Sequence, residues 1–203
     1  MLRPGARGSA CQDRGVPQPG SHRGRLLVAT PPLVDPNFDR TVVLMLEHGD
    51  DGALGVVLNR RSETAIGDVF PEWGEVVSPP DVVFAGGPVS TDAVIALARR
   101  RDATAGEREG FVQILDDLGT VDLAQDPLDI GASLDALRVF AGYAGWTPGQ
   151  LEAELAQGAW FVVAMEPGDP FVAAPERLWR DVLRRQRGRL ALFSNYPEDA
   201  TVN

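Results

Sequence analysis

Apolar residues gather in three short runs near the N-terminal end of the chain. These runs are Leu26–Ala29, Thr41–Leu46 and Ala53–Leu58. Runs of four to eight apolar residues bounded by Pro, Gly and Asp are typical of buried strands. Because Val42–Leu46 contains no polar alternation, we expect this strand to be covered on both faces of a sheet.

The second and third runs predict a β-hairpin. The polar segment between them ends in Asp51-Gly52, which supplies the positive backbone angles of a tight reversal. Three more strands are predicted later in the chain, at Val82–Ala85, Leu137–Tyr143 and Trp160–Met165. The pattern leaves Ala93–Ala98 open between helix and strand, and Phe111–Leu115 and Gly119–Leu123 open between edge strand and loop.

Short helices are predicted among these strands. Thr147 is a good N-cap, Pro148 suits the first helical position, and Gln150 completes a capping box. Short helices that alternate irregularly with strands from distant parts of the chain predict an α+β fold, built on a curved, largely antiparallel, barrel-like sheet with the helices packed around it. The predicted helices are Thr64–Phe70 with Thr64 as its cap, the segment from Thr147 to Gly158, and Pro175–Arg187.

The first 23 residues differ in composition from the rest. They are rich in Gly, Pro and Arg and lack the apolar stretch of a secretory signal peptide. We therefore expect a disordered tail over 1–23 and a single domain over 24–203. Residues 1–25 carry a charge of +4 and the remainder carries −14. Because an acidic body repels phosphate, only a local basic patch could bind nucleic acid.

Composition also excludes several kinds of chemistry. All 19 basic residues are Arg, so no lysine Schiff base, Walker-type lysine or Ser–Lys dyad can form. The single cysteine, Cys11, allows no intramolecular disulfide, which fits a cytoplasmic protein. No apolar run approaches the roughly 18 residues that a membrane span requires, so no membrane partner is expected.

Several blocks of the sequence resemble the bacterial YqgE/AlgH family in order and in rough spacing. The blocks are Leu26–Pro31, Asp35–Leu44, Glu47-His48, Gly52–Arg60, Gly86–Val89, Gly142–Glu152 and Trp160. The resemblance covers about residues 24–203. It implies a compact domain of sheet and helices in a cytosolic bacterial protein. Members of this family are essentially uncharacterised, and some have been proposed as transcriptional regulators without an established DNA-binding motif or enzymatic activity.

Polar residues at the ends of the first strands form the leading candidate site. Arg40 offers a planar fork for a carboxylate or phosphate, and His48 could transfer a proton near neutral pH. His48 is the only histidine outside the tail, so we expect no two-histidine metal site, and no cofactor is expected. The same residues also fit a structural interpretation, with an Asx-type turn and backbone caps. The set is Asp35, Asn37, Asp39, Arg40, His48 and Asn59.

Two further candidates lie later in the chain. Tyr143 and Trp146 could stack on a planar ligand, or they could fill the core while the neighbouring glycines allow tight curvature. Arginines at helical spacing could contact nucleic acid or an acidic partner, or form a solvated helix face. These arginines are Arg177, Arg180, Arg184 and Arg187.

Three hypotheses about function remain. The first is a cytosolic regulatory or binding protein that uses a polar surface around the first hairpin to hold a small anion or a protein partner. The second is a small hydrolase or isomerase with His48 as acid–base and Arg40 as anion holder. The third is a DNA-binding transcriptional regulator. The absence of the standard catalytic motifs favours the first over an enzyme.

Overall fold

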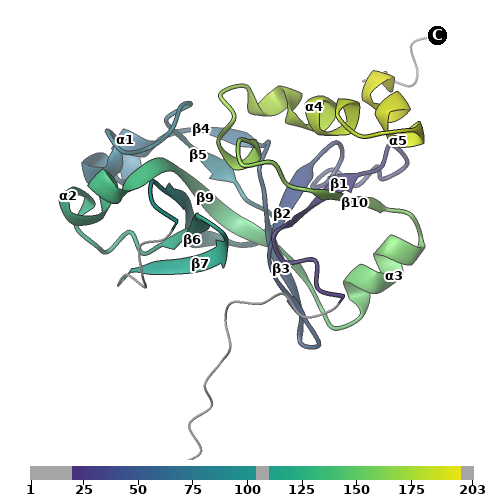
Figure 1. The fold of residues 1–203 in the computed structure, drawn as a ribbon, viewed down its shortest axis with the longest axis horizontal. Coiled ribbons are helices and arrows are strands. Elements are labelled where there is room, and N and C mark those ends of the chain that lie inside the picture. Colours follow the sequence, from purple (N-terminus) through teal and green to yellow (C-terminus); the bar gives the residue numbers. More distant parts are fainter. Residues whose placement is uncertain (1–19, 104–109, 198–203) are drawn as a thin grey trace, which may run out of the picture.

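The computed structural model describes residues 20–103 and 110–197, whose strands form one curled sheet (Figure 1). The strand order is β10-β1-β2-β3-β9-β6-β8-β7, with β5 beside β9 and β4 beside β5. The pairings are antiparallel, except that β5 runs parallel to β9. The predicted α+β class with a curved, largely antiparallel sheet is confirmed. The strands are β1 (Arg25–Ala29), β2 (Val42–Gly49), β3 (Gly52–Val57), β4 (Arg61–Ala65), β5 (Val82–Ala85), β6 (Val89–Arg100), β7 (Phe111–Leu115), β8 (Leu118–Val121), β9 (Leu134–Trp146) and β10 (Trp160–Ala164).

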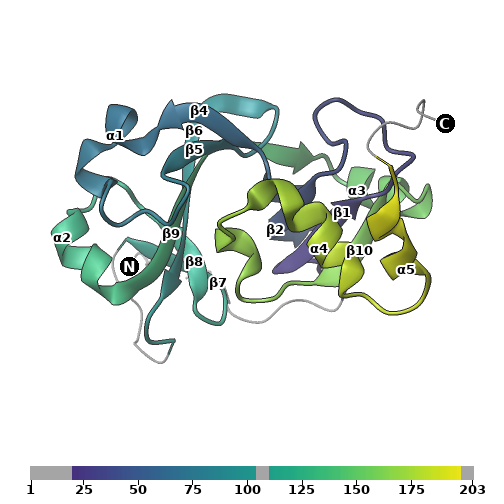
Figure 2. The same cartoon turned by 90° about the horizontal axis from the view of Figure 1, so that it is seen from above.

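Short helices cover the sheet on several sides (Figures 1 and 2). The α4–α5 pair lies over β1 and β10, α3 lies below the same strands, and α1 and α2 flank the other half of the sheet. Within the described part of the chain, no helix combines the length and apolar character needed to cross a bilayer. The elements are α1 (Ile66–Val69), α2 (Pro127–Ile130), α3 (Gln150–Ala156), α4 (Leu178–Arg184), α5 (Arg189–Leu192) and the 3₁₀ turns η1 (Pro71–Trp73), η2 (Gly131–Ser133), η3 (Asp169–Phe171), η4 (Pro175–Arg177) and η5 (Phe193–Asn195).

Strand β2 is buried on both faces, as its uninterrupted apolar sequence predicts. Leu44 packs into a core that includes Val182 of α4. Val43 and Met45 point the other way, into a core that includes Leu151 of α3. Side chains alternate between the two faces of a strand, so a strand without polar alternation needs a hydrophobic layer on each side.

Strand β9 connects the two halves of the sheet. Most of its length pairs with β6, and its last residues, Ala144–Trp146, pair with β3. It extends beyond the predicted Leu137–Tyr143 at both ends. The segment Ala93–Ala98, which the pattern left open between helix and strand, lies inside β6 because β8 and β9 pair with it on either side.

The two glycines that follow β5 bring the chain into close contact with the backbone of β9. A Cβ on Gly86 would overlap the carbonyl oxygen of Gly142, and a Cβ on Gly87 would overlap the backbone of Tyr143. Gly142 itself has a φ of +71°, a left-handed conformation that favours glycine. The glycines therefore permit this close backbone crossing.

The predicted start of the first helix is wrong. Thr64 lies in β4, which pairs with β5, and the helix begins only at Ile66 after Ala65, without a side-chain cap. Arg61 pairs with Phe84 of β5, and this pairing holds the segment that contains Thr64 in an extended conformation. Local capping preference is weak compared with such tertiary pairing.

The other two helices form nearby but are shorter than predicted. Gly149 has a φ of +75°, so α3 begins at Gln150 rather than Pro148. Gln150 Oε1 still accepts a hydrogen bond from the backbone N–H of Thr147 at 3.1 Å, which is one half of the expected capping box. The segment Pro175–Arg187 contains η4 and α4, and its helix ends at Arg184.

The described chain begins inside the expected tail. Residues 1–19 lie outside the described residues, whereas Ser21, His22 and Arg23 make hydrogen bonds to β2 and β7. The contacts of the domain therefore extend at least three residues before Gly24.

Arg138 of β9 is a fully buried cation that joins three segments. Its guanidinium donates hydrogen bonds to the carbonyl oxygens of Pro170 at 3.0 Å, Pro79 at 2.7 Å and Val172 at 3.0 Å, and it stacks on Phe84 at 4.3 Å. Burial lowers the pKa of Arg138 to about 10. The positive charge is thus stabilised by three carbonyl groups and an aromatic ring instead of by a carboxylate.

Replacing Gly87 with Ala should destabilise the fold, because the added methyl group meets the rigid backbone of Tyr143. We expect a loss of about 2–4 kcal/mol in the free energy of unfolding, measured by urea denaturation. Gly67→Ala is the control, because a Cβ at Gly67 meets nothing within 4 Å. Equal stabilities for the two variants would contradict the close crossing.

Replacing Arg138 with Met should leave three carbonyl oxygens without their donor. Unfolding in urea should then show a loss of about 3 kcal/mol or more. Arg101→Met removes a guanidinium whose side chain is 65% exposed and should change stability by less than about 1 kcal/mol. A stability for Arg138→Met within that smaller range would show that the buried guanidinium does not hold these segments together.

Candidate functional site

Arg40 lies before the start of β2 and is committed to structural contacts. Its guanidinium donates hydrogen bonds to the carbonyl oxygens of Tyr196 and Pro197 and lies 5.0 Å from the ring centroid of Trp179. The amide of Asn59 accepts from the N–H of Val42 at 2.9 Å and donates to the carbonyl of Arg40 at 2.9 Å. Asn59 thus fixes the backbone beside Arg40, which has a φ of +50°.

The acidic and amide residues before Arg40 form a turn. Asp35 Oδ1 accepts a hydrogen bond from the backbone N–H of Asn37 at 2.7 Å, which is the Asx turn of the structural interpretation. The carbonyl of Asp39 accepts from Arg60 at 2.9 Å. Asp35, Asn37 and Asp39 are all exposed at this end of the sheet.

His48 lies at the opposite end of β2 from Arg40. His48 is six positions after Val42, which is roughly 20 Å along an extended strand. The imidazole Nδ1 accepts the backbone N–H of His22 at 3.0 Å, so Nε2 carries the proton and donates to Glu152 Oε1 at 2.8 Å. The hypothesis of one site containing both Arg40 and His48 is therefore wrong in its geometry. Each end of the strand holds one of the two groups.

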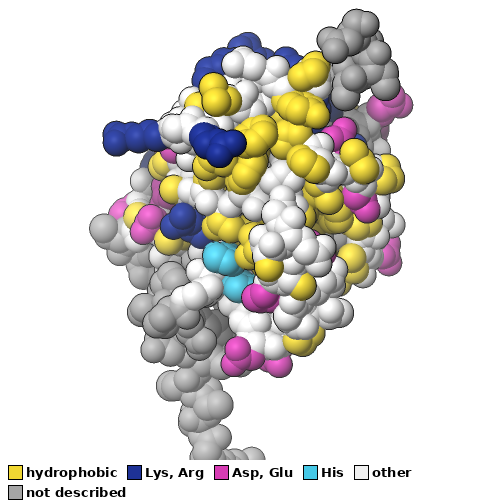
Figure 3. Space-filling model, turned by 90° about the vertical axis from the view of Figure 1, so that its right-hand side faces the viewer, with side chains coloured by type: hydrophobic (Ala, Val, Ile, Leu, Met, Phe, Trp, Pro, Cys, Tyr) yellow, Lys and Arg dark blue, Asp and Glu magenta, His cyan; other side chains and the backbone are white. Residues whose placement is uncertain are grey.

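His22 and Glu152 are the residues that the sequence analysis missed. His22 stacks on His48 with ring centroids 5.0 Å apart and planes 10° apart, at the surface shown in Figure 3. Assigning His22 to a tail hid this pair and led to the exclusion of a two-histidine site. Even so, no group of three or more His, Cys, Asp or Glu in the described ranges is placed to hold a metal ion.

The surroundings shift the pKa values of His22 and Glu152. Burial lowers the pKa of His22 most, and the neighbouring His48 and Arg25 lower it further, while Glu152 opposes them. A hydrogen bond from its own backbone N–H and the one from His48 lower the pKa of Glu152. The cluster therefore favours a neutral His22 beside an ionised Glu152.

Trp146 is buried in the core and Tyr143 packs against it, which fits the structural interpretation of this pair. Tyr143 is partly buried against the core beneath α4. The indole N–H groups of Trp146 and Trp160 both donate to Glu154 Oε2, at 2.9 and 2.8 Å. Phe38 packs edge-on against Trp160, so these aromatic rings fill the space between them.

The four predicted arginines lie in and around α4, with Arg177 just before the helix and Arg187 after it. Arg177, Arg184 and Arg187 are exposed and Arg180 is half-buried. Arg184 approaches Asp181 only at 3.5 Å, an exposed pair that contributes little to stability. Basic side chains gather along the upper part of this surface in Figure 3.

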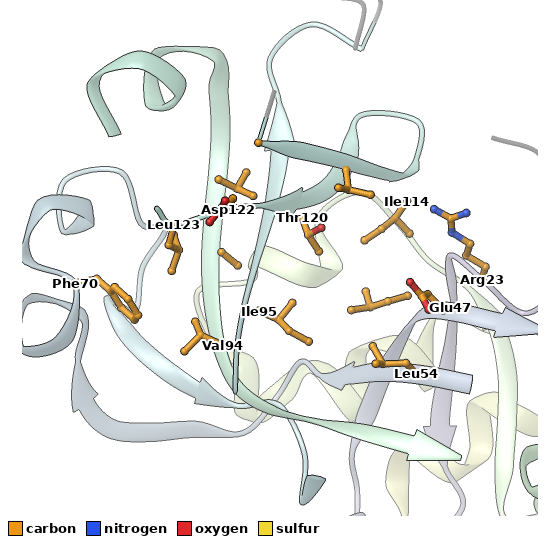
Figure 4. Close-up of a pocket in the computed structure, with 15 residues that line it drawn as sticks. Arg23, Glu47, Leu54, Phe70, Val94, Ile95, Ile114, Thr120, Asp122 and Leu123 are labelled. Carbon is orange, nitrogen blue, oxygen red and sulfur yellow. The ribbon is translucent and has the colours of Figure 1, made fainter. Parts of the chain in front are cut away.

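A mainly apolar groove of about 620 Å³ lies between the first hairpin and the β6–β8–β7 part of the sheet. Figure 4 shows Phe70 and Leu123 at one end and Arg23 and Glu47 at the other. Val94 is 46% exposed and Val112 is 51% exposed. The lining residues from the first hairpin are Leu46, Glu47 and Leu54. No sequence motif marks this groove, because its residues come from several segments that lie far apart in the chain, although the undecided pattern at Ala93–Ala98 overlaps it.

Comparison with known proteins identifies the family. A family model described as AlgH-like matches residues 26–191. A UPF0301 protein of Streptomyces coelicolor is 51% identical over 191 residues, covering 93% of this chain and 99% of that relative. A UPF0301 protein of Thermobifida fusca is 50% identical, covering 89% of this chain and 94% of that relative.

Two solved structures have the same fold. The crystal structure of a Corynebacterium diphtheriae protein matches with a TM-score of 0.79 and 34% identity, covering 91% of this chain and 95% of that one. The solution structure of the AlgH protein from Pseudomonas aeruginosa matches with a TM-score of 0.65 and 30% identity, covering 90% and 98%. Since the family model spans most of the domain and these relatives cover nearly the whole chain, the chain belongs to the AlgH-like (UPF0301) family.

Proposed function

We propose that this protein is a cytoplasmic binding protein whose groove takes an extended, mainly apolar segment of a protein partner. The observation that carries the proposal is the exposure of Val94 and Val112 inside one groove of about 620 Å³. Concave, mainly apolar surfaces of a few hundred Å³ or more that carry a few polar groups are typical of binding sites. The single cysteine of the chain supports a reducing compartment.

The edge of β6 inside the groove favours an extended peptide. Strand β8 pairs with β6 only from Ala96 to Arg99, and β9 occupies the other edge of β6. The edge of β6 that faces β8 has no strand partner among the described residues at Val94 and Ile95. Both residues line the groove. A strand added there could use backbone hydrogen bonds for affinity and the apolar lining for side chains.

Charge at the groove favours basic flanks on the bound segment. Glu47 and Asp122 line it, against Arg23 as the one cation among the lining residues. The first hairpin lines this groove, although the sequence predicted a polar surface there. It does so through Leu46, Glu47 and Leu54 and not through Arg40 or His48. An enzymatic role for His48 gains no support, because both its ring nitrogens are engaged.

The groove can be tested with a labelled peptide of alternating Val and Thr flanked by Lys. Fluorescence polarisation should show binding that weakens about tenfold or more in Val112→Asp, because a carboxylate is costly against apolar side chains. Val34→Asp is the matched control, because Val34 is 82% exposed outside the groove. A peptide with N-methylated backbone amides should lose binding if it adds as a strand. Equal binding to both variants would contradict the groove as the site.

One observation favours a second candidate, binding of duplex DNA or another nucleic acid through the α4 face. Residues 177–189 contain six Arg and one acidic residue, in a chain with a net charge of −10. Arg suits phosphate because its fork of donors can bind two oxygens. Three of these side chains are exposed and would present their charge along one side of the molecule. They are Arg177, Arg184 and Arg187.

Duplex DNA at low salt should therefore bind more weakly to Arg187→Glu than to Arg61→Glu, a variant with the same charge change on exposed β4. Fluorescence anisotropy over a salt series gives the slope of the logarithm of the binding constant against the logarithm of the salt concentration. The magnitude of this slope should be smaller by about one for each phosphate contact removed. An identical loss in both variants would indicate an effect of net charge and would count against the α4 face.

A further inference from the structure

The N-terminal segment Ser21–Gly24, here called the strap, crosses one end of the groove. Gly24 N–H donates to the carbonyl of Met45 on β2 at 2.8 Å. Arg23 Nη2 donates to the carbonyl of Gln113 on β7 at 2.7 Å. Arg23 also lines the groove beside Glu47 (Figure 4). The strap thus spans from the first hairpin to β7 and closes the charged end of the groove.

Two hydrogen bonds to one residue hold the start of the strap. Ser21 Oγ donates to the backbone carbonyl of His48 at 3.0 Å. The N–H of His22 donates to His48 Nδ1 at 3.0 Å, and the two imidazoles stack. The second bond exists only while His48 Nδ1 has a free lone pair, which is the neutral form of the ring.

Glu152 couples this bond to protonation. His48 Nε2 already carries the proton that it donates to Glu152, so an added proton must go to Nδ1. Protonated Nδ1 would point an N–H at the N–H of His22 and break the contact. The strap therefore loses this acceptor whenever the His48 ring takes up a second proton.

The charges around His22 act in the same direction. The titratable and charged groups that influence it are His48 on β2, Arg25 on β1 and Glu152 on α3. Two stacked cationic rings would repel each other, and only Glu152 offsets this. Burial lowers the pKa of His22 in the docked strap, so docking is strongest above the ordinary histidine pKa of about 6.5 and weakens as pH falls below it.

We propose that the strap is a pH-sensitive closure of the groove, held by the His22–His48–Glu152 cluster and released on acidification. Release moves Arg23 away from the groove and opens that end to a longer peptide. This inference rests on the proposed peptide-binding function for its biological meaning, whereas the release itself is a separate physical event.

Release can be followed by ¹H–¹⁵N spectra of the full chain between pH 8 and pH 5. The amides of His22 and Gly24 should leave their hydrogen bonds together, with a midpoint below about 6.5. His48→Asn keeps a side-chain oxygen acceptor near the Nδ1 position and leaves only His22 to titrate, so both amides should stay bonded to a lower pH than in the wild type. Glu152→Gln should move the midpoint to lower pH, because it removes the carboxylate that raises the pKa of His22.

Binding of the Lys-flanked Val/Thr peptide is measured on the same samples. Affinity in the wild type should rise about threefold or more between pH 7.5 and pH 5.5, which is the size expected from a modest shift in population, and should rise less in His48→Asn. Amides that remain bonded at pH 5 in the wild type, or that release equally in His48→Asn, would overturn the closure. Release without peptide binding at any pH would instead sustain the closure and reject the groove function.

Discussion

The buried guanidinium of Arg138 holds together the parts of the structure on which both candidate surfaces depend. It reaches from β9 to Pro79, in the loop before β5, and to Pro170 and Val172, in the connection that leads to α4. A charge without a carboxylate partner is costly to bury, so the three carbonyl groups must stay in place to solvate it. This constraint fixes the position of α4 relative to β9, and with it the place of the arginine face relative to the sheet.

The long, doubly covered β2 keeps two sets of polar residues apart. Arg40 and Asn59 stabilise one end, where the guanidinium and the amide bind backbone groups. His48 lies at the other end with His22 and Glu152. Polar residues that are close in sequence need not share a site, because a strand of eight residues extends roughly 25 Å.

Much of the fold could be predicted from the sequence, because periodicity reports burial directly. The run Val42–Leu46 predicted coverage on two faces, and Val82–Ala85 matches β5 residue for residue. Helix boundaries were less predictable. Thr64 has a good capping side chain, yet pairing with β5 draws it into β4, and that pairing depends on residues far away in the chain. The groove and the contact of His22 with His48 are also products of tertiary structure, so no local pattern could indicate them.

The pairing of β1 with β10 has a consequence for synthesis on the ribosome. Leu27 of β1 lies opposite Val162 of β10, so the two are separated by most of the domain. Trp179 of α4 also donates its indole N–H to the carbonyl of Ala29 at 2.8 Å. While the chain is being translated, β1 can pair with β2 but has an open edge until β10 emerges. An open strand edge can pair with another chain, so the nascent β1–β2 pair would benefit from a chaperone until β10 has been synthesised.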